Sequence, residues 1–298
     1  MPSELYLQNA ALSLSVSSLG AEMQYLRTHD GDDLLWHGDT RFWGGRAPVL
    51  FPIVGRAVDD MIAVDDFSAK MAQHGFARRS NFALKEQSDE MCCHVLRDTD
   101  DSRAVYPFAL TLEISHRLDG ATLHVTARVE NESDRVMPFG FGFHPAFCWP
   151  LPGAGTGTGI GAGDGDAVHH VSLASGGAPD MRRLEGGLLR RDPIPGPFVN
   201  GRLEIREELF VDDALVFPNG SDALFYGLPD GRGLEFIFTN LPDLALWRPT
   251  GAPFLCIEPW HGTAPHVGDG HQIADRPNSV ALDPGQSIEF GYSVTVAL

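Results

Sequence analysis

Two ionisable side chains interrupt apolar, proline-punctuated stretches of the sequence, where they could carry out general acid–base chemistry. His144 ends the run PFGFGFH of residues 138–144, and Glu258 lies within FLCIEPWHG, residues 254–262. An imidazole exchanges protons near neutral pH, and a carboxylate inside an apolar strand is either paired with an arginine or is a desolvated base with a raised pKa. Because burying a carboxylate without a purpose is costly, we favour a functional role for Glu258.

Three phenylalanines precede His144 and alternate with glycine. This spacing predicts that Phe139, Phe141 and Phe143 line one face of a strand. Such rings can form a floor on which a sugar ring stacks, with His144 at its edge as the proton carrier. They can equally form an aromatic core stripe with a polar cap, and the pattern alone leaves both interpretations open.

Two further polar residues lie beside glycines at the ends of apolar runs. Arg56 ends PVLFPIVGR, residues 48–56, and His74 lies in QHGFAR, residues 73–78, beside Gly75. Taken alone, Arg56 is best interpreted as a surface ion-pair partner and His74 as a satisfied structural histidine.

The elements that must position these residues are β-strands. Every second side chain of residues 122–129 is apolar, which is the period of a half-buried strand, and residues 288–296 repeat the pattern. Other strand-like runs are residues 11–16, 91–96, 110–118 and 233–239. Long helical periods are nearly absent. We therefore predict an all-β chain that folds as one domain over residues 1–298.

Two glycine-rich stretches predict long loops. Residues 151–166 contain GAGTGTGIGAGDGD, but no strand–turn–helix pattern surrounds them and their acidic residues would repel a phosphate, so a dinucleotide site is not expected. We expect this segment to hang free as a mobile loop rather than fold over a cleft. Residues 175–197, rich in Gly, Pro and Arg, predict a second excursion.

The composition limits the choice of partners. The chain has 22 Lys and Arg against 40 Asp and Glu, a formal charge of −18, which argues against binding to nucleic acid or to anionic membranes. No run approaches the roughly 18 apolar residues of a membrane span, and no signal peptide is evident. The four cysteines form no Cys-x-x-Cys pair, so we expect reduced thiols in a cytoplasmic protein.

Several catalytic classes lack their signatures. We find neither the carboxylate pair on tandem strands of most glycosidases nor a serine in a nucleophile elbow. His261, His266 and His271 have no zinc-motif spacing, and we predict no metal site.

Four blocks, in this order, resemble the aldose 1-epimerases (galactose mutarotases), specifically the LacX-like branch, over nearly the full length of the chain. The blocks are Trp36 with WGGRAPVLFPIVGR of residues 43–56, QHGFAR of residues 73–78, GFHPAF of residues 142–147, and CIEPWHG of residues 256–262. The resemblance implies a galactose-mutarotase-like β-supersandwich with an open sugar-binding cleft and no metal or organic cofactor.

The resemblance also implies roles for individual residues. Glu258 would be the general base that removes the proton of the anomeric hydroxyl, and His144 the general acid that protonates the ring oxygen. Arg56 and His74 would hold sugar oxygens, and a substrate-binding aspartate is expected at Asp213, with Asp212 as the alternative. On physical grounds, Trp260 could offer a flat face for the sugar.

The mechanism requires Glu258 to be ionised and His144 to be protonated near neutral pH. We expect the two charges to stabilise each other and to titrate as a pair. The GFHP block replaces an Asn-His-based block of other galactose mutarotases, so the preferred sugar does not carry over. The expected partner is a small sugar, bound by a monomer or a homodimer.

Two other functions remain open. The first is a hexose-6-phosphate 1-epimerase, which would need an additional basic site, for which Arg46, Arg78, Arg79 and Arg248 are candidates. The net charge of −18 speaks against it. The second is a non-catalytic carbohydrate-binding or sensing protein, against which the presence of both His144 and Glu258 argues.

Overall fold

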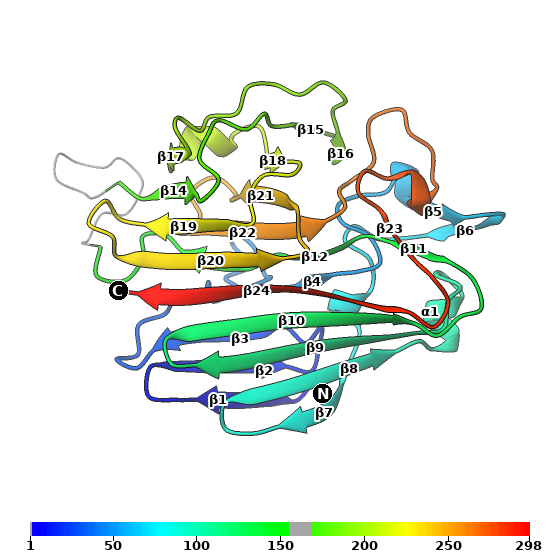
Figure 1. Ribbon diagram of the computed structural model, residues 1–298, viewed down its shortest axis with the longest axis horizontal. Coiled ribbons are helices and arrows are strands. Elements are labelled where there is room, and N and C mark those ends of the chain that lie inside the picture. Colours follow the sequence, from blue (N-terminus) through cyan, green and yellow to red (C-terminus); the bar gives the residue numbers. More distant parts are fainter. Residues whose placement is uncertain (1, 155–167) are drawn as a thin grey trace.

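Antiparallel β-sheets, packed face to face, form the framework of the computed structural model, which describes residues 2–154 and 168–298 (Figure 1). The prediction of an all-β fold is confirmed. The largest sheet has nine strands in the order β17 (Arg202–Glu204), β14 (His170–Leu173), β19 (Ala223–Gly227), β20 (Gly233–Thr239), β24 (Ser287–Ala297), β10 (Thr122–Asn131), β9 (Leu110–Asp119), β8 (Met91–Arg97) and β7 (Ala83–Gln87).

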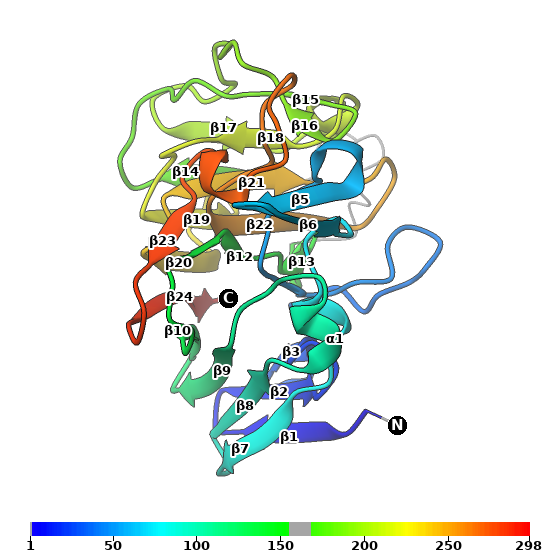
Figure 2. The same ribbon diagram turned by 90° about the vertical axis from the view of Figure 1, so that its right-hand side faces the viewer.

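A second large sheet carries the candidate site. Its strands are β18 (Leu215–Phe217), β21 (Asp243–Trp247), β22 (Phe254–His261), β12 (Phe141–Phe143) and β4 (Val49–Leu50), with β13 (Ala146–Cys148) also paired to β22. A three-stranded sheet, β1 (Glu4–Gln8), β2 (Leu12–Ser17) and β3 (Met23–Thr28), lies against the β7–β9 end of the nine-stranded sheet (Figures 1 and 2).

The remaining elements are short. Three two-stranded ribbons are β5 (Met61–Val64) with β6 (Phe67–Lys70), β11 (Met137–Phe139) with β23 (Val280–Leu282), and β15 (Leu184–Glu185) with β16 (Leu188–Leu189). One α-helical turn, α1 (Asp100–Arg103), and the 3-10 turns Val58–Asp60, Ala77–Arg79, Glu207–Phe210 and Ile273–Asp275 complete the described elements.

The strand periodicity read from the sequence is observed in the large sheet. In β10, Leu123, Val125, Ala127 and Val129 are all buried, whereas the side chains between them are not. In β24, Phe290, Tyr292 and Val294 are buried on the same face. Apolar residues at every second position therefore define the face of this sheet that packs inward.

Aromatic contacts join this inward face to the second sheet. Phe141 stacks on Phe290 with ring centroids 4.8 Å apart, and Phe143 meets Tyr292 edge-on at 4.9 Å. Because side chains alternate along β22, its odd-numbered residues Leu255 and Ile257 enter this core, while the side chains between them point to the opposite face.

The structure corrects the prediction that Phe139, Phe141 and Phe143 share one strand. The strand is interrupted at Gly140. Phe139 therefore belongs to β11 and the other two phenylalanines to β12, and these strands lie in different sheets. All three rings are at most 2% exposed and belong to the main core. Of the two interpretations left open, the aromatic core stripe is the correct one. A different aromatic side chain must therefore stack on any bound sugar.

Three expectations concern the remaining chain. The four cysteines are free thiols. No helix among the described residues is long and apolar enough to cross a membrane. Most of the glycine-rich stretch 151–166 lies outside the described residues, and its predicted mobility stays a prediction.

Candidate active site

Strand pairing brings His144 and Glu258 together. In the pairing of β12 and β13 with β22, Gly142 is opposite Trp260 and Ala146 is opposite Cys256. The same register, continued between these two pairs, places His144 opposite Glu258. The backbone N–H of Ile257 donates to the carbonyl of Pro145 at 3.1 Å, which holds the two segments together between the pairs.

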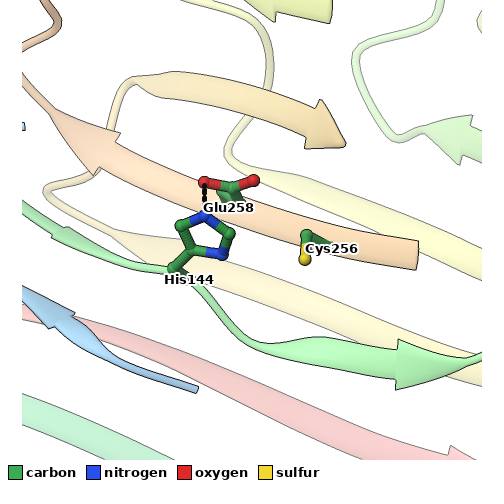
Figure 3. A group of neighbouring side chains, drawn as sticks. All are labelled: His144, Cys256 and Glu258. Atoms are coloured by element: carbon green, nitrogen blue, oxygen red, sulfur yellow. Dashed lines mark ion pairs between the residues drawn. The ribbon is translucent and has the colours of Figure 1, made fainter. Parts of the chain in front are cut away.

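The two side chains are buried and lie in direct contact. His144 Nε2 lies 3.1 Å from Glu258 Oε2 (Figure 3), and the two residues are 6% and 2% exposed. The indole of Trp43 stacks on the imidazole with centroids 4.8 Å apart and covers one of its faces. The geometry required for a shared proton is therefore present and shielded from bulk water.

Burial acts against charge separation in this pair. It raises the pKa of the Glu258 carboxyl well above its usual value, helped by Asp213, while Arg78 opposes the shift. It lowers the pKa of the His144 imidazole well below its usual value, with His74 and Arg78 acting in the same direction. The sequence predicted two charges that stabilise each other, but desolvation of both side chains favours the neutral pair, with the proton on Glu258.

A pocket of about 340 Å³ opens onto the pair. Both residues line it, together with Gly55 beyond β4, Val216 of β18 and Trp247 of β21. The short ribbon β15–β16 contributes Leu184 and Leu189 to the wall. The pocket therefore lies on the face of the second sheet that points away from the core.

His74 lines the pocket beside the pair. Its ring meets that of His144 edge-on with centroids 5.6 Å apart, and its Nδ1 accepts a hydrogen bond from the N–H of Gly55 at 3.1 Å. Burial, and then the charges of Arg78 and other arginines, lower the pKa of His74 to about 3. The ring is therefore neutral near neutral pH, with its proton on Nε2, which lies 3.3 Å from the side-chain amide of Gln73.

Two residues of the pocket lining adopt a left-handed backbone conformation without being glycine. They are His74, with φ of 65°, and Asp213, with φ of 71°. Such conformations cost energy and collect at functional sites, which supports a role for both side chains. Of the two aspartates considered, Asp213 lines the pocket and Asp212 is exposed outside the lining.

The structure does not place Arg56 among the residues that line the pocket. The chain turns at Gly55, where φ is 71°, and the Arg56 side chain pairs with Asp60 at 3.0 Å on the surface. Arg78 instead lines the pocket, and within the described residues its guanidinium forms neither an ion pair nor a hydrogen bond. Arg78 belongs to the QHGFAR block, but the sequence named it only as one of four candidates for a phosphate site.

Three tryptophans line the pocket. Trp260 was predicted, and its indole is 6% exposed there. Trp43 and Trp247 were not predicted as site residues, although Trp43 lies in one of the quoted blocks. Trp247 meets His144 edge-on at 5.8 Å and had no signal of its own in the sequence. These indoles, rather than the phenylalanines of β12, offer flat faces to a ligand.

Three buried donors could in principle hold a metal ion. Ligand atoms of His144, Cys256 and Glu258 all lie within 4.8 Å of one another. Burial raises the pKa of the Cys256 thiol well above its usual value, and a metal would require the thiolate. Since Glu258 also favours its protonated form, this chemistry suits proton transfer better than metal ligation, and the absence of a metal site stays a prediction.

Comparisons with known proteins bear on this arrangement. The model of the aldose 1-epimerase family matches residues 3–159, a segment that contains His74 and His144 but not Glu258. The LacX proteins of Lactococcus lactis subsp. lactis, one plasmid-encoded and one chromosomal, are each 26% identical to the chain over 299 residues, covering 97% of this chain and 98% of theirs.

Solved structures agree in fold. A galactose mutarotase related enzyme from Lactobacillus acidophilus has a TM-score of 0.88 at 24% identity, covering 99% of this chain and 97% of its own. A galactose mutarotase-like protein from Lactobacillus casei has the same TM-score and identity, covering 99% and 100%. The predicted galactose-mutarotase-like architecture is confirmed.

Proposed function

Because the chain belongs to the aldose 1-epimerase family, we propose that it is a free-aldose mutarotase in which Glu258 and His144 act as base and acid. Family membership makes it an isomerase of the sugar epimerase type. The observation that carries the proposal is the 3.1 Å contact between His144 Nε2 and Glu258 Oε2 at the pocket.

The reaction opens and recloses the pyranose ring. Glu258 removes the proton of the anomeric hydroxyl as His144 Nε2 donates a proton to the ring oxygen, and the bond between C1 and that oxygen breaks. The open-chain aldehyde then rotates about C1–C2. The former ring oxygen attacks the other face of C1, returning its proton to His144 while Glu258 reprotonates the anomeric oxygen, so that no proton is gained or lost.

The active protonation state differs from the resting one by the position of a single proton. With the proton on Glu258 the pair is neutral, and moving it along the 3.1 Å contact to His144 creates the carboxylate base and the imidazolium acid. Arg78 favours the carboxylate, since its charge lowers the pKa of Glu258. Binding of a sugar beside Arg78 would exclude water and strengthen this effect.

The remaining lining groups suit a neutral, hydroxyl-rich ligand. His74 offers an N–H, Asp213 a carboxylate acceptor and Arg78 a fork of donors, while the indoles of Trp43 and Trp247 supply apolar faces. A pyranose presents hydroxyls at its rim and C–H groups on its faces, so both kinds of contact have a match.

The charge of the pocket favours an unphosphorylated sugar. Within its described lining, Arg78 is the one Lys or Arg, and Asp213 and Glu258 contribute two carboxyl groups. The other arginines considered for a phosphate site, Arg46, Arg79 and Arg248, do not line the pocket. A phosphate dianion would find a single cation there.

Polarimetry on freshly dissolved α-D-glucose and α-D-galactose tests the proposal. We expect the protein to accelerate the approach to anomeric equilibrium, and Glu258→Gln to reduce that acceleration by about 100-fold or more. Glu235→Gln, on the exposed face of β20, is the matched control and should leave the rate unchanged.

Each contrary result points to a different alternative. If the protein accelerates mutarotation of glucose 6-phosphate but of neither free sugar, the proposal of an unphosphorylated substrate is rejected. If calorimetry detects sugar binding but mutarotation is accelerated for none of these sugars, catalytic activity is rejected in favour of a sugar-binding protein. Full activity of Glu258→Gln would reject the role of Glu258 as the general base.

A further inference from the structure

The imidazolium of His144 needs a stabiliser beyond Glu258. His74 and Arg78 both act against a positive charge on this ring. The sulfur of Cys256 lies near the pair, but burial raises the pKa of this thiol, so it stays neutral and offers no negative charge. Glu258 becomes negative only when it gives up its own proton. Any further stabilisation of the protonated ring by the described residues must therefore come from an uncharged group.

The indole of Trp43 is an uncharged group that stacks on this ring. The two ring planes are 25° apart and their centroids are 4.8 Å apart. The face of an indole carries excess negative charge, so it attracts a cation within about 6 Å of its centre, and the attraction grows when water is excluded. His144 is 6% exposed. A neutral imidazole gains little from this attraction, so the contact selectively favours the protonated ring.

We propose that Trp43 is a positioning residue whose indole face stabilises the imidazolium of His144 and so allows the proton of Glu258 to pass to Nε2. The proton moves along the contact between Oε2 and Nε2, and Trp43 neither gains nor loses a proton. The proposal deepens the mutarotase function proposed above and rests on it. Trp43 would thereby stabilise the charged acid, as Arg78 stabilises the charged base.

Trp43 lies in the loop between β3 and β4, where two hydrogen bonds hold its backbone. Its N–H donates to the carbonyl of Asp39 at 3.0 Å, and its carbonyl accepts from Nε1–H of the buried Trp36 at 2.9 Å. Gly45 passes so close that a Cβ atom there would lie 2.5 Å from Cζ2 of the Trp43 indole. These contacts hold the indole on the imidazole, and no ligand is needed to order it.

A second indole of the protein contacts a buried cation through its face. The guanidinium carbon of Arg248 lies 4.2 Å from the ring centre of Trp149, and Arg248 is 2% exposed. Neither residue lines the pocket that opens onto His144 and Glu258. Trp149 therefore provides a matched control, because it makes the same kind of contact outside the pocket.

Substitutions of Trp43 by natural residues give the first test, read out by mutarotation kinetics. We expect Trp43→Leu, which removes the aromatic face, to lower kcat about tenfold or more while KM changes within about threefold. Trp43→Phe keeps a weaker aromatic face and should restore most of the rate. An equal loss of kcat in both variants would mean that only packing matters. A rise in KM with unchanged kcat would mean that the indole serves the sugar rather than His144. Either result would reject the role.

5-Fluorotryptophan, introduced at position 43 of the full-length protein by nonsense suppression, isolates the electronic effect. Fluorine withdraws electron density from the face of the indole, and the carbon that carries it, Cζ3, is not among the three ring atoms nearest Gly45. We expect kcat to fall about two- to threefold with KM unchanged, and the same replacement of Trp149 to leave kcat unchanged.

An unchanged kcat with the fluorinated Trp43, or an equal loss at both positions, would overturn the proposal while leaving the mutarotase function in place. A wild type that accelerates mutarotation of no sugar would instead reject the proposed function, and this role of Trp43 with it.

Discussion

The proton shared by His144 and Glu258 is subject to two opposing influences at the scale of single residues. Desolvation favours the neutral pair, whereas the guanidinium of Arg78 favours the carboxylate. A ligand that fills the pocket would remove water from around Arg78 and leave its charge less screened. Arg78 is therefore expected both to hold a sugar oxygen and to help generate the base.

Substitutions of Arg56 and Arg78, two of the arginines in the sequence blocks, should differ in their effects on catalysis. We expect Arg78→Gln to lower kcat/KM by about 10- to 100-fold, because the charge beside the base and a donor to the sugar are lost together. Arg56→Gln should stay within about twofold, since its side chain pairs with Asp60 on the surface, and exposed ion pairs contribute little.

Mutarotation rates at a series of sugar concentrations provide the measurement for both variants. A large loss in Arg56→Gln with a normal Arg78→Gln would reverse the assignment. It would mean that the surface pair with Asp60 opens when substrate binds.

At the scale of elements, strand register is what assembles the acid and the base. His144 and Glu258 meet because β12 and β13 pair with β22 around Gly142–Trp260 and Ala146–Cys256. The alternation of each strand can be read locally, as residues 122–129 demonstrate. Which strands pair depends on contacts between segments more than a hundred residues apart, and no local pattern encodes them.

The same limit explains what the sequence could and could not predict about the site. Glu258 and His144 stand out because polar side chains in apolar runs are unusual, whereas His74 was singled out only by the family resemblance. For Arg56 the residue pattern indicated a surface ion pair, which the structure shows with Asp60, whereas the family resemblance implied a place among the sugar-binding residues. Trp247 looks like any strand residue until β21 is placed beside β22.

Gly142 links the pairing of these strands to the shape of the pocket. A Cβ atom at this position would lie 2.4 Å from Cδ1 of Trp260, its cross-strand neighbour. We expect Gly142→Ala to lower the free energy of unfolding by about 1–3 kcal/mol through overpacking, and to raise KM as Trp260 is displaced. Urea unfolding and mutarotation kinetics measure the two effects.

Gly140→Ala is the matched control for this substitution. A Cβ at Gly140 would meet its nearest atom, the Val54 nitrogen, at 3.4 Å, which is ordinary contact. Its stability and KM should stay close to the wild type. If Gly140→Ala and Gly142→Ala had the same effects, the position of the Trp260 indole would not depend on the absence of a side chain at Gly142.

At the scale of the whole molecule, the packed sheets bury several histidines as neutral rings. His94 and His116 lie on the adjacent strands β8 and β9 and are 0% and 2% exposed. Both nitrogens of His94 and Nδ1 of His116 lack partners among the described residues. Burial lowers the pKa of His116 from 6.5 to about 3, so the folded protein resists its protonation.

This burial predicts that stability is lost on the acid side of neutrality. The unfolded chain binds a proton at His116 below pH 6.5, whereas the folded chain does not until about pH 3, so folding is penalised increasingly between these values. For His116 alone the free energy of unfolding should fall by about 2 kcal/mol between pH 7 and pH 5.

Urea unfolding of the wild type and of His116→Met at both pH values isolates the contribution of His116. We expect the loss on acidification to be smaller by that amount in His116→Met, and unchanged in the exposed control His29→Gln. An equal loss in His116→Met and wild type would show that His116 is protonated in the folded state, and hence that the layer between the sheets admits water or a counter-charge there.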